Sequence, residues 1–231
     1  MAKRKVANPL AFAVLGCLGE RPMHPYEMST MLRARGKDTS IKLNYGSLYS
    51  VVAALEKHGF IEAVETVRDG NRPERTVYAI TEAGGEEFED WLSELLGKPE
   101  KEFSQLEAGL AYMPGFPPDR VVELLEQRAK ALDAEIEEIE GMHAYMESTK
   151  FPRLFWVESE LRLELLKTQV KFVRHLTEQI SSDKLEGGAH WRKGFELVEK
   201  LGIHPGELLK DPVKYFGEEF AWMAEVPPEA R

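Results

Sequence analysis

The fold is decided by residues 45–84, which read YGSLYSVVAALEKHGFIEAVETVRDGNRPERTVYAITEAG. The first third of this stretch has apolar residues three and four positions apart, which is the spacing of one helix face. These residues are Leu48, Val51, Val52 and Leu55. We therefore predict a helix over about 47–58 that ends at Gly59, the residue type that most often follows a helix.

After this helix the pattern changes to the period of a strand. β-Branched residues are frequent over 60–67, and alternating residues over 76–80 share one face. The polar turn between them contains the pair Asp69-Gly70, which is typical of a β-hairpin. Thr81 then stands where the N-cap of a further helix is expected, because acidic residues follow it in the first turns.

Two shorter helices precede the decisive stretch. Asn8 and Pro9 suit the N-cap and first position of a helix that ends near Gly19. Pro25 opens a second helix, which ends at Gly36. Three helices followed by a hairpin are the order of elements in a winged helix-turn-helix.

The second half of the chain is predicted to be helical. Apolar residues recur every seven positions along one long helix and form a coiled-coil-like seam. The seam consists of Val122, Leu125, Ala129, Leu132, Ile136, Ile139, His143 and Met146. Pro152 opens a second long helix, so the two form an antiparallel hairpin. On the inward face of the second helix we expect Leu161, Leu165, Phe172, Leu176 and Ile180.

These patterns give a fold class that is mainly α with a small β-hairpin. We predict a winged helix-turn-helix DNA-binding domain over residues 1–97 and a helical, coiled-coil-like dimerisation domain over 98–182. Residues 183–231 are predicted to form a helical C-terminal extension, to which the sequence assigns no role.

The apolar seam also predicts an oligomer. It needs more partner surface than the second long helix supplies, and symmetric dimers are the commonest assembly. A homodimer would place two recognition helices roughly 34 Å apart, the spacing of successive major-groove faces. The predicted dimerisation residues are Leu125, Leu132, Ile139, Leu161, Leu165 and Phe172. A closed intramolecular bundle is the alternative.

Charge is distributed unevenly along the 231 residues. The whole chain carries 30 Lys and Arg against 40 Asp and Glu, a formal net charge of −10. Residues 1–80, however, carry 12 basic against 8 acidic residues, and residues 81–231 carry 18 against 32. A basic module on an acidic body can dock on a polyanion in one orientation, so the N-terminal third is the expected contact.

The sequence contains none of the common catalytic signatures. It has no glycine-rich phosphate loop, HExxH or Gly-x-Ser-x-Gly motif, and its six histidines lack metal-ligand spacing. The single cysteine, Cys17, lies in an apolar helix and excludes an internal disulfide framework. We therefore predict no enzyme activity, cofactor or metal. With no membrane span and no signal cleavage site after Leu18, we expect a cytoplasmic protein.

The candidate DNA-binding residues lie on the third helix and at the tip of the hairpin. The exposed helix face and the segment before it carry Lys42, Tyr45, Ser47, Tyr49, Ser50 and Lys57. Hydroxyls at a helix N-terminus can contact phosphates and base edges in a major groove. Arginines at the tip suit the DNA backbone or the minor groove, and these are Arg68, Arg72 and Arg75. The alternative is a surface helix whose tyrosines merely pack.

Four separated motifs within residues 8–95 resemble the PadR family of transcriptional regulators. They are His24-Pro25-Tyr26-Glu27-Met28, Tyr45-Gly46-Ser47-Leu48-Tyr49, the run LEKHGFI over 55–61 and the run RTVYAITEAG over 75–84. The resemblance implies a dimeric repressor that binds double-stranded operator DNA and is often released by a small ligand. It also implies that Ser47, Tyr49 and Ser50 lie in the groove and that Arg72 and Arg75 lie on the wing.

Aromatic residues suggest where a small effector would bind. Trp91 and Trp156 fall where the two predicted domains approach each other, and aromatic clefts at such junctions bind apolar ligands. We predict these two residues as ligand contacts, with plain packing as the alternative. A different class of function also stays open, namely a winged-helix adaptor that binds another protein without reading DNA.

Overall fold

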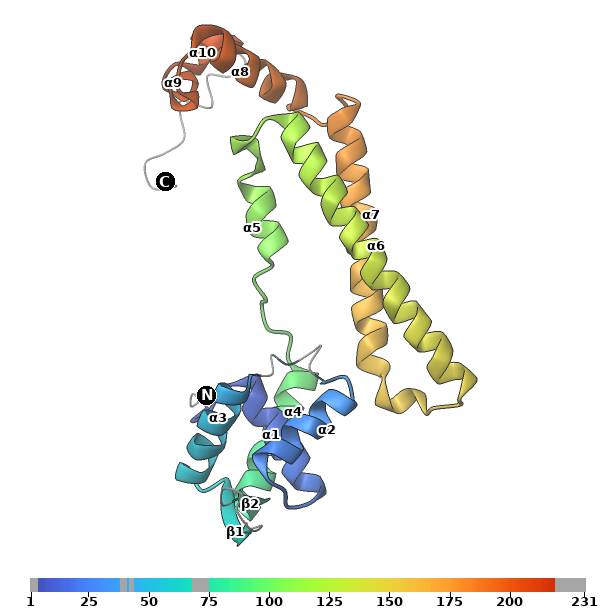
Figure 1. Cartoon of the computed structure of the whole chain (residues 1–231). Helices are drawn as coiled ribbons and strands as arrows, with labels where there is room; N and C mark the ends of the chain where they lie inside the picture. Colours follow the sequence, from blue (N-terminus) through green and yellow to red (C-terminus); the bar gives the residue numbers. More distant parts are fainter. Residues whose placement is uncertain (1–3, 38–40, 42–43, 68–74, 219–231) are drawn as a thin grey trace. The chain divides into compact units, whose positions relative to one another are not determined.

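The computed structural model describes residues 4–37, 41, 44–67 and 75–218. The chain divides into two compact units, residues 1–102 (unit 1) and 103–231 (unit 2), shown in Figure 1. The predicted fold class is confirmed, because helices predominate and the described residues form one two-stranded antiparallel sheet. The division of the chain into functional domains stays a prediction. Three predicted DNA contacts, Lys42, Arg68 and Arg72, lie outside the described residues.

Unit 1 contains the predicted order of three helices, a hairpin and a fourth helix. Every described boundary falls within about two residues of the predicted one. The elements are α1 (Pro9–Glu20), α2 (Pro25–Ala34), α3 (Tyr45–Lys57), β1 (Ile61–Val67), β2 (Arg75–Ile80) and α4 (Glu82–Gly97).

The core of unit 1 is built around α1. The Asn8 side chain accepts a hydrogen bond from the Leu10 amide at 2.9 Å, and Pro9 occupies the first helical position, so the predicted start is confirmed. α1 is short, apolar on all sides and packs against α2, α3, α4 and β2. A helix without a polar face needs such enclosure. Its fully buried residues include Leu10, Val14 and Leu15.

The two strands of the hairpin pair with each other, and β2 is also hydrogen-bonded to the segment just before α2. Ile61 pairs with Ile80 at the base of the sheet, and the register shifts between Ala63 and Glu65. The Met23 amide donates to the Tyr78 carbonyl at 3.0 Å, and the Tyr78 amide donates back at 3.2 Å. Two reciprocal backbone bonds therefore fix the residues just before α2 against β2.

The start of α4 packs unusually close to the loop before β1. The Thr81 hydroxyl accepts a hydrogen bond from the Gly84 amide at 3.1 Å, which confirms the predicted N-cap. Gly84 is buried, and a Cβ at this position would lie 2.0 Å from the Phe60 carbonyl oxygen. No side chain fits there, so glycine is required by close approach of the two backbones.

Unit 2 consists of a long helical hairpin with short helices at one end. The short helices α5 and η2 precede the helical hairpin, and α8, α9 and α10 lie near the end of α7 (Figure 1). The elements are α5 (Gln105–Ala111), η2 (Met113–Gly115), α6 (Pro118–Ser148), η3 (Arg153–Phe155), α7 (Val157–Ser181), α8 (Gly188–Leu201), α9 (Pro205–Lys210) and α10 (Pro212–Phe216).

The antiparallel pairing of α6 and α7 is as predicted, and ion pairs join the two helices along their length. These pairs are Arg174–Asp133 at 2.5 Å, Arg162–Glu135 at 2.5 Å and Lys167–Glu140 at 2.8 Å. Exposed pairs add little free energy, typically about 0.2–1 kcal/mol each, but they favour a single register. Pro152 does not open α7 itself, since a short 3-10 turn intervenes and the helix begins at Val157.

One prediction about α7 is wrong. Leu161, Leu165 and Phe172 do not face α6, because they are 64%, 62% and 50% exposed. Leu176 and Ile180 are buried as predicted, and the other inward positions are Leu163, Val170 and Val173. Val170, Val173, Leu176 and Ile180 share a core with Leu125 and Leu132, and Ile139 is also buried. α7 thus has two apolar stripes, of which α6 covers one.

The contact at Gly84 predicts a sharp difference between two neighbouring substitutions. Gly84→Ala should destabilise unit 1 by about 3 kcal/mol, because the methyl group forces α4 away from Phe60. Gly85→Ala should stabilise it by about 0.5–1 kcal/mol, since nothing lies within 4 Å of its Cβ position and alanine favours helix. Hydrogen exchange of the α1 amides measures both, and equal effects would contradict the close approach.

Candidate nucleic-acid interface

The candidate interface is the exposed face of α3. Leu48, Val51, Val52 and Leu55 are buried, so the helix turns its opposite side to solvent, as its spacing predicts. The first turn contains no acidic residue, and the Asn44 side chain accepts the Gly46 amide at 3.0 Å. The positive end of the helix dipole is therefore uncompensated, which favours an approaching phosphate.

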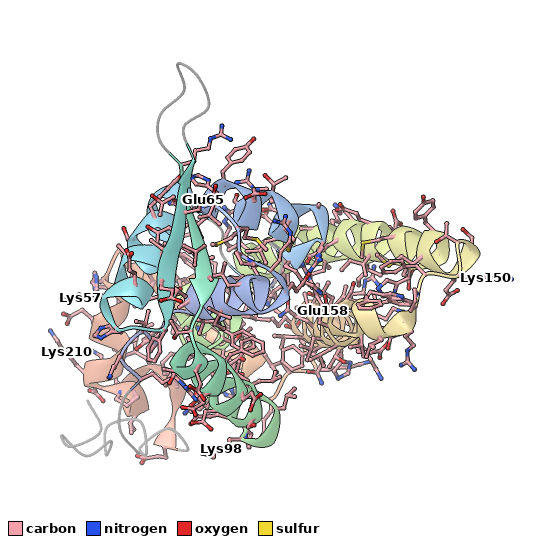
Figure 2. All side chains as sticks on the ribbon, turned by 90° about the horizontal axis from the view of Figure 1, so that it is seen from below. Lys57, Glu65, Lys98, Lys150, Glu158 and Lys210 are labelled. Atoms are coloured by element: carbon pink, nitrogen blue, oxygen red, sulfur yellow. The ribbon has the colours of Figure 1, made fainter. Side chains whose placement is uncertain are left out.

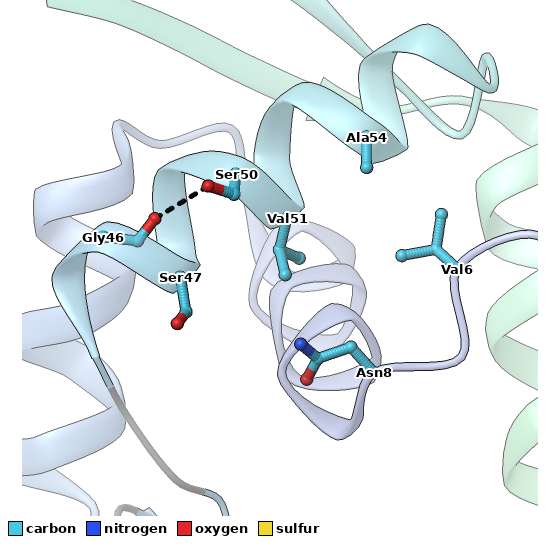
Figure 3. Close-up of a pocket in the computed structure, with 7 residues that line it drawn as sticks. All are labelled: Val6, Asn8, Gly46, Ser47, Ser50, Val51 and Ala54. Carbon is cyan, nitrogen blue, oxygen red and sulfur yellow. Dashed lines mark hydrogen bonds between the residues drawn. The ribbon is translucent and has the colours of Figure 1, made fainter.

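Small residues occupy the middle of this face. Ser50 and Ala53 are exposed, and Lys57 follows on the same side two turns beyond Ser50, about 10 Å along the axis. The Ser50 hydroxyl donates to the Gly46 carbonyl at 3.0 Å, drawn as a dashed line in Figure 3. Its proton is thus committed to the helix, and its oxygen remains available to accept a hydrogen bond. Short side chains here let the helix approach a partner closely.

One flank of the face borders a shallow hollow of about 340 Å³. Ser47, Ser50 and Ala54 line it from α3, and Val6 and Asn8 line it from the segment before α1 (Figure 3). Ser47 is half-buried at this edge. The hollow therefore presents two hydroxyls beside the amide end of the helix, a combination suited to a phosphate or sugar of the DNA backbone.

The other flank carries Tyr49, which packs against the start of α2. Its ring meets the His24 imidazole edge-on, with centroids 6.4 Å apart and planes at 68°. Tyr49 is still 50% exposed, so about half of its surface is available to a partner molecule. His24 therefore holds one predicted DNA-binding side chain in place.

His24 is also the N-cap of α2. Its Nδ1 accepts the Tyr26 amide at 3.0 Å, and the Glu27 carboxylate accepts the His24 amide at 2.9 Å, forming a capping box. An accepting Nδ1 requires the neutral ring with its proton on Nε2. The pKa of His24 is lowered from its ordinary value, first by desolvation and then by the positive charge of Arg75, while Glu27 opposes the shift.

Arg75 pairs with Val67 at the end of the hairpin that adjoins its tip, and its positive charge acts on His24. It is the first residue of β2, and it is exposed. The Met23–Tyr78 bridge holds this strand beside the residue that precedes His24. Figure 2 shows the hairpin projecting from unit 1, with Glu65 on it and Lys57 at the end of α3. His24 thus contacts the Tyr49 ring and is also affected by the charge of Arg75.

The basic N-terminal arm behaves differently from the wing. Arg4 donates to Glu87 and to Glu94, each at 2.6 Å, and its guanidinium lies 5.0 Å from the Trp91 ring centroid. Lys5 lies over the Phe60 ring at 5.8 Å. The charge of Arg4 is therefore neutralised by α4, so this residue anchors the arm within unit 1.

The two predicted ligand-binding tryptophans are enclosed in their own units. Trp91 is buried in the unit 1 core beside Phe12, with ring centroids 5.6 Å apart. Trp156 is buried in unit 2, where its ring lies 4.5 Å from that of His143 and its N–H donates to the Phe151 carbonyl at 3.5 Å. Their role in ligand binding stays a prediction.

Sequence reasoning missed two residues of this surface. Ala53 lies at the centre of the exposed face of α3 but carries no functional group that would draw attention. His24 supports Tyr49, and its signal was present as a capping box, His24 followed three positions later by Glu27. The side chain of Tyr45 lies outside the described part of the structure, although its backbone begins α3.

The described residues give little support for a reactive thiol, a metal site or a membrane-spanning helix. Cys17 is buried, and burial, followed by the charge of Glu20, raises the pKa of its thiol to about 11. A thiol of that pKa stays protonated at neutral pH. The described part of the chain contains no group of three or more metal-ligating side chains. None of its helices is both long and apolar enough to span a bilayer.

Comparisons with known proteins agree with this geometry. The model of the family described as "Transcriptional regulator PadR-like family" matches residues 14–90. Among curated proteins, no sequence matches this chain.

Solved structures share the fold. *Bacillus subtilis* PadR in complex with operator DNA is 18% identical with a TM-score of 0.62, over 74% of this chain and 99% of that one. *Bacillus subtilis* PadR in complex with p-coumaric acid is 17% identical with a TM-score of 0.60, over 74% and 98%. The *Vibrio cholerae* virulence activator AphA is 13% identical with a TM-score of 0.59, over 75% and 98%.

The winged-helix unit and its family match define the class of this protein, a DNA-binding transcriptional regulator. Residues 14–90 of the chain match the PadR-like family, which confirms the resemblance seen in the motifs.

The two roles of His24 can be separated by substitution. His24→Ala should destabilise α2 by about 1 kcal/mol through loss of the cap, whereas His24→Asn should keep most of that stability because asparagine also caps helices. Both variants remove the ring that supports Tyr49, so both should weaken DNA binding. Hydrogen exchange and fluorescence anisotropy measure the two effects, and full DNA affinity in His24→Asn would exclude the positioning role.

The lowered pKa of His24 also predicts a pH dependence. The unfolded chain binds a proton at about the ordinary value of 6.5, above the folded pKa. The stability due to the neutral cap is therefore fully present above pH 6.5 and is lost as the pH falls through the folded pKa. In hydrogen exchange, α2 of the wild type should lose more protection below pH 6.5 than α2 of His24→Asn.

Proposed function

We propose that the protein is a homodimeric repressor that binds operator DNA with α3 in the major groove and the wing on the adjacent backbone. The observation that carries this proposal is the exposed face of α3, in which the small residues Ser50 and Ala53 are flanked by Ser47 and Tyr49. This surface fits a regulator better than an enzyme, and DNA binding accords with the expected cytoplasmic location.

The chemistry of the α3 face supports readout of bases. Ser50 can accept a hydrogen bond from a base amino group, and the Ala53 methyl suits the thymine methyl group. Tyr49 and Ser47, on opposite flanks, are placed to contact the two walls of the groove. We therefore propose that specificity depends on α3, with Lys57 contacting a phosphate.

The wing supplies positive charge for contacts with DNA that do not depend on its base sequence. Arg75 is exposed at the end of β2 that adjoins the tip, and Arg68 and Arg72, outside the described residues, are proposed to add to its charge. Phosphate contacts of this kind release counterions and make affinity depend on salt. The *Bacillus subtilis* PadR complex with operator DNA supports this assignment for a protein of the same fold.

Substitutions should separate the two roles. Arg75→Ala should weaken binding to all DNA sequences alike and lower the slope of log affinity against log salt by about 1. Ala53→Val should instead change the ranking of DNA fragments by about 1–3 kcal/mol at one base position. Fluorescence anisotropy across a salt series measures both, with Lys130→Ala, an exposed lysine on α6, as the control. An unchanged slope in Arg75→Ala would remove the wing from the interface.

The uncovered stripe of α7 supports the dimer. Leu161, Leu165 and Phe172 lie four and seven positions apart and so share one face, and all three are at least half exposed. A contiguous apolar stripe of this kind marks a contact surface. A second copy of the chain presents the same stripe, as a two-fold symmetric interface requires. Leu125, Leu132 and Ile139 would then act indirectly, by holding α7 on α6.

A double substitution tests the dimer. Leu161→Glu with Leu165→Glu should give a monomer of 26.3 kDa in light scattering, where the wild type has twice that mass. Burying four like charges across a symmetric interface is strongly unfavourable, while the exposed stripe leaves the fold of each chain intact. Leu154→Glu, an equally exposed leucine outside α7, is the control. A dimeric double variant would show that another surface joins the subunits.

Release by a small apolar or aromatic ligand completes the proposal. Bacillus subtilis PadR, a protein of the same fold, forms a complex with p-coumaric acid, and this supports the proposal. Trp91 and Trp156 are the residues proposed to respond, although each has packing partners within its own unit. A ligand that displaces either ring from those partners would change the packing of that unit.

A further inference from the structure

The C-terminal part of unit 2 encloses a second cavity, separate from the α3 surface. Its volume is about 640 Å³, within the range of small-molecule sites, which is roughly 300–1,000 Å³. α8, α9, α10 and η2 provide its walls. The main apolar residues lining it are Met113, Trp191, Phe195, Val198, Leu208 and Phe216.

The wall formed by α8 is braced against the start of α6. The Trp191 indole N–H donates to the Phe116 carbonyl at 2.9 Å. Arg192 pairs with Asp119 at 2.7 Å and with Asp183 at 3.3 Å. The Trp191 ring is therefore held in one orientation with its polar atom already satisfied, and it offers an apolar surface to the cavity.

The opposite wall is held close to α8 by a glycine and a tight turn. Gly194 is buried, and a Cβ there would lie 3.3 Å from the Phe216 ring. α8 ends at Leu201 and is followed by Gly202 in the left-handed conformation, φ 61°; the His204 Nδ1 then caps α9 by accepting the Gly206 amide at 3.1 Å. The walls are thus built from defined contacts on both sides, so the cavity is pre-organised.

Two ionisable residues line this otherwise apolar space. Glu186 is the one carboxylate among the described lining residues and is exposed, and His190, four positions later, is half-buried. A carboxylate at the edge of an aromatic pocket attracts an ammonium group and repels a carboxylate. Aromatic walls favour a flat ring, both by area and by ring-to-ring geometry. The size of the cavity, its aromatic walls and the charge of Glu186 therefore all favour a small molecule with a flat ring and an ammonium group.

We propose that this cavity binds a small aromatic molecule that carries one amino group, with the ring between α8 and α10 and the ammonium at Glu186. The proposal concerns binding by unit 2 and holds whether or not the chain regulates transcription as proposed above.

Two probes with the same ring and opposite charge test the proposal. Isothermal titration calorimetry of the full chain should show tryptamine binding at one site per chain. Indole-3-acetate should bind roughly fivefold more weakly, the range expected for one exposed charge contact. Glu186→Gln should reduce this preference to less than about twofold. Glu196→Gln, an exposed carboxylate on α8 that does not line the cavity, should leave the preference unchanged.

A third variant locates the ligand. Val198→Phe adds a ring to the cavity wall and should abolish tryptamine binding. Dispersed NMR spectra of this variant would establish that it folds. If it does not fold, the comparison of Glu186→Gln with Glu196→Gln tests the site independently.

Several outcomes would overturn the proposal. These are no binding of tryptamine, equal binding of the two probes, or unchanged binding in a folded Val198→Phe chain. Binding seen only after deletion of residues 219–231, which lie outside the described residues, would make that segment the occupant and would also overturn it.

Discussion

The proposed DNA-binding surface depends on two backbone hydrogen bonds between Met23 and Tyr78, which join residues 55 positions apart in the chain. Met23 is fully buried, so these bonds are shielded from water and lie in the core of unit 1. They fix β2, and with it Arg75, beside the residue that precedes His24. Because His24 caps α2 and supports Tyr49, the same contact relates the wing to α3. The two halves of the interface are thus positioned through one bridge.

The interface combines close approach with weak, distributed charge. The small side chains of Ser50 and Ala53 occupy the middle of the exposed face of α3. Larger side chains lie at the flanks of this face and on the wing. Arg4 is neutralised by Glu87 and Glu94, so this residue adds no free charge to the proposed interface. Among the described residues of that interface, Lys57 and Arg75 are basic and exposed, and such charge on an acidic protein would orient its encounter with DNA.

Local signals in the sequence predicted much of unit 1. Asn8 and Thr81 cap helices as expected, and the exposed positions of Ser50, Tyr49 and Lys57 follow from the helical spacing of buried leucine and valine. The orientation of α7 could not be predicted, because it has two apolar stripes and a heptad count cannot say which one meets α6. The ion pairs of Arg4 and the cavity behind Trp191 depend on contacts distant in sequence, which no local pattern records.

The central claim is that α3 and the wing recognise DNA by sequence. The most direct test is fluorescence anisotropy of the wild-type chain with the DNA upstream of its own gene, and with fragments selected from the genome, against scrambled DNA over a salt series. We expect salt-dependent binding that is at least about 10³-fold tighter for a selected fragment than for its scrambled counterpart. Equal, weak binding to every fragment would contradict it and would favour a winged-helix adaptor that binds another protein.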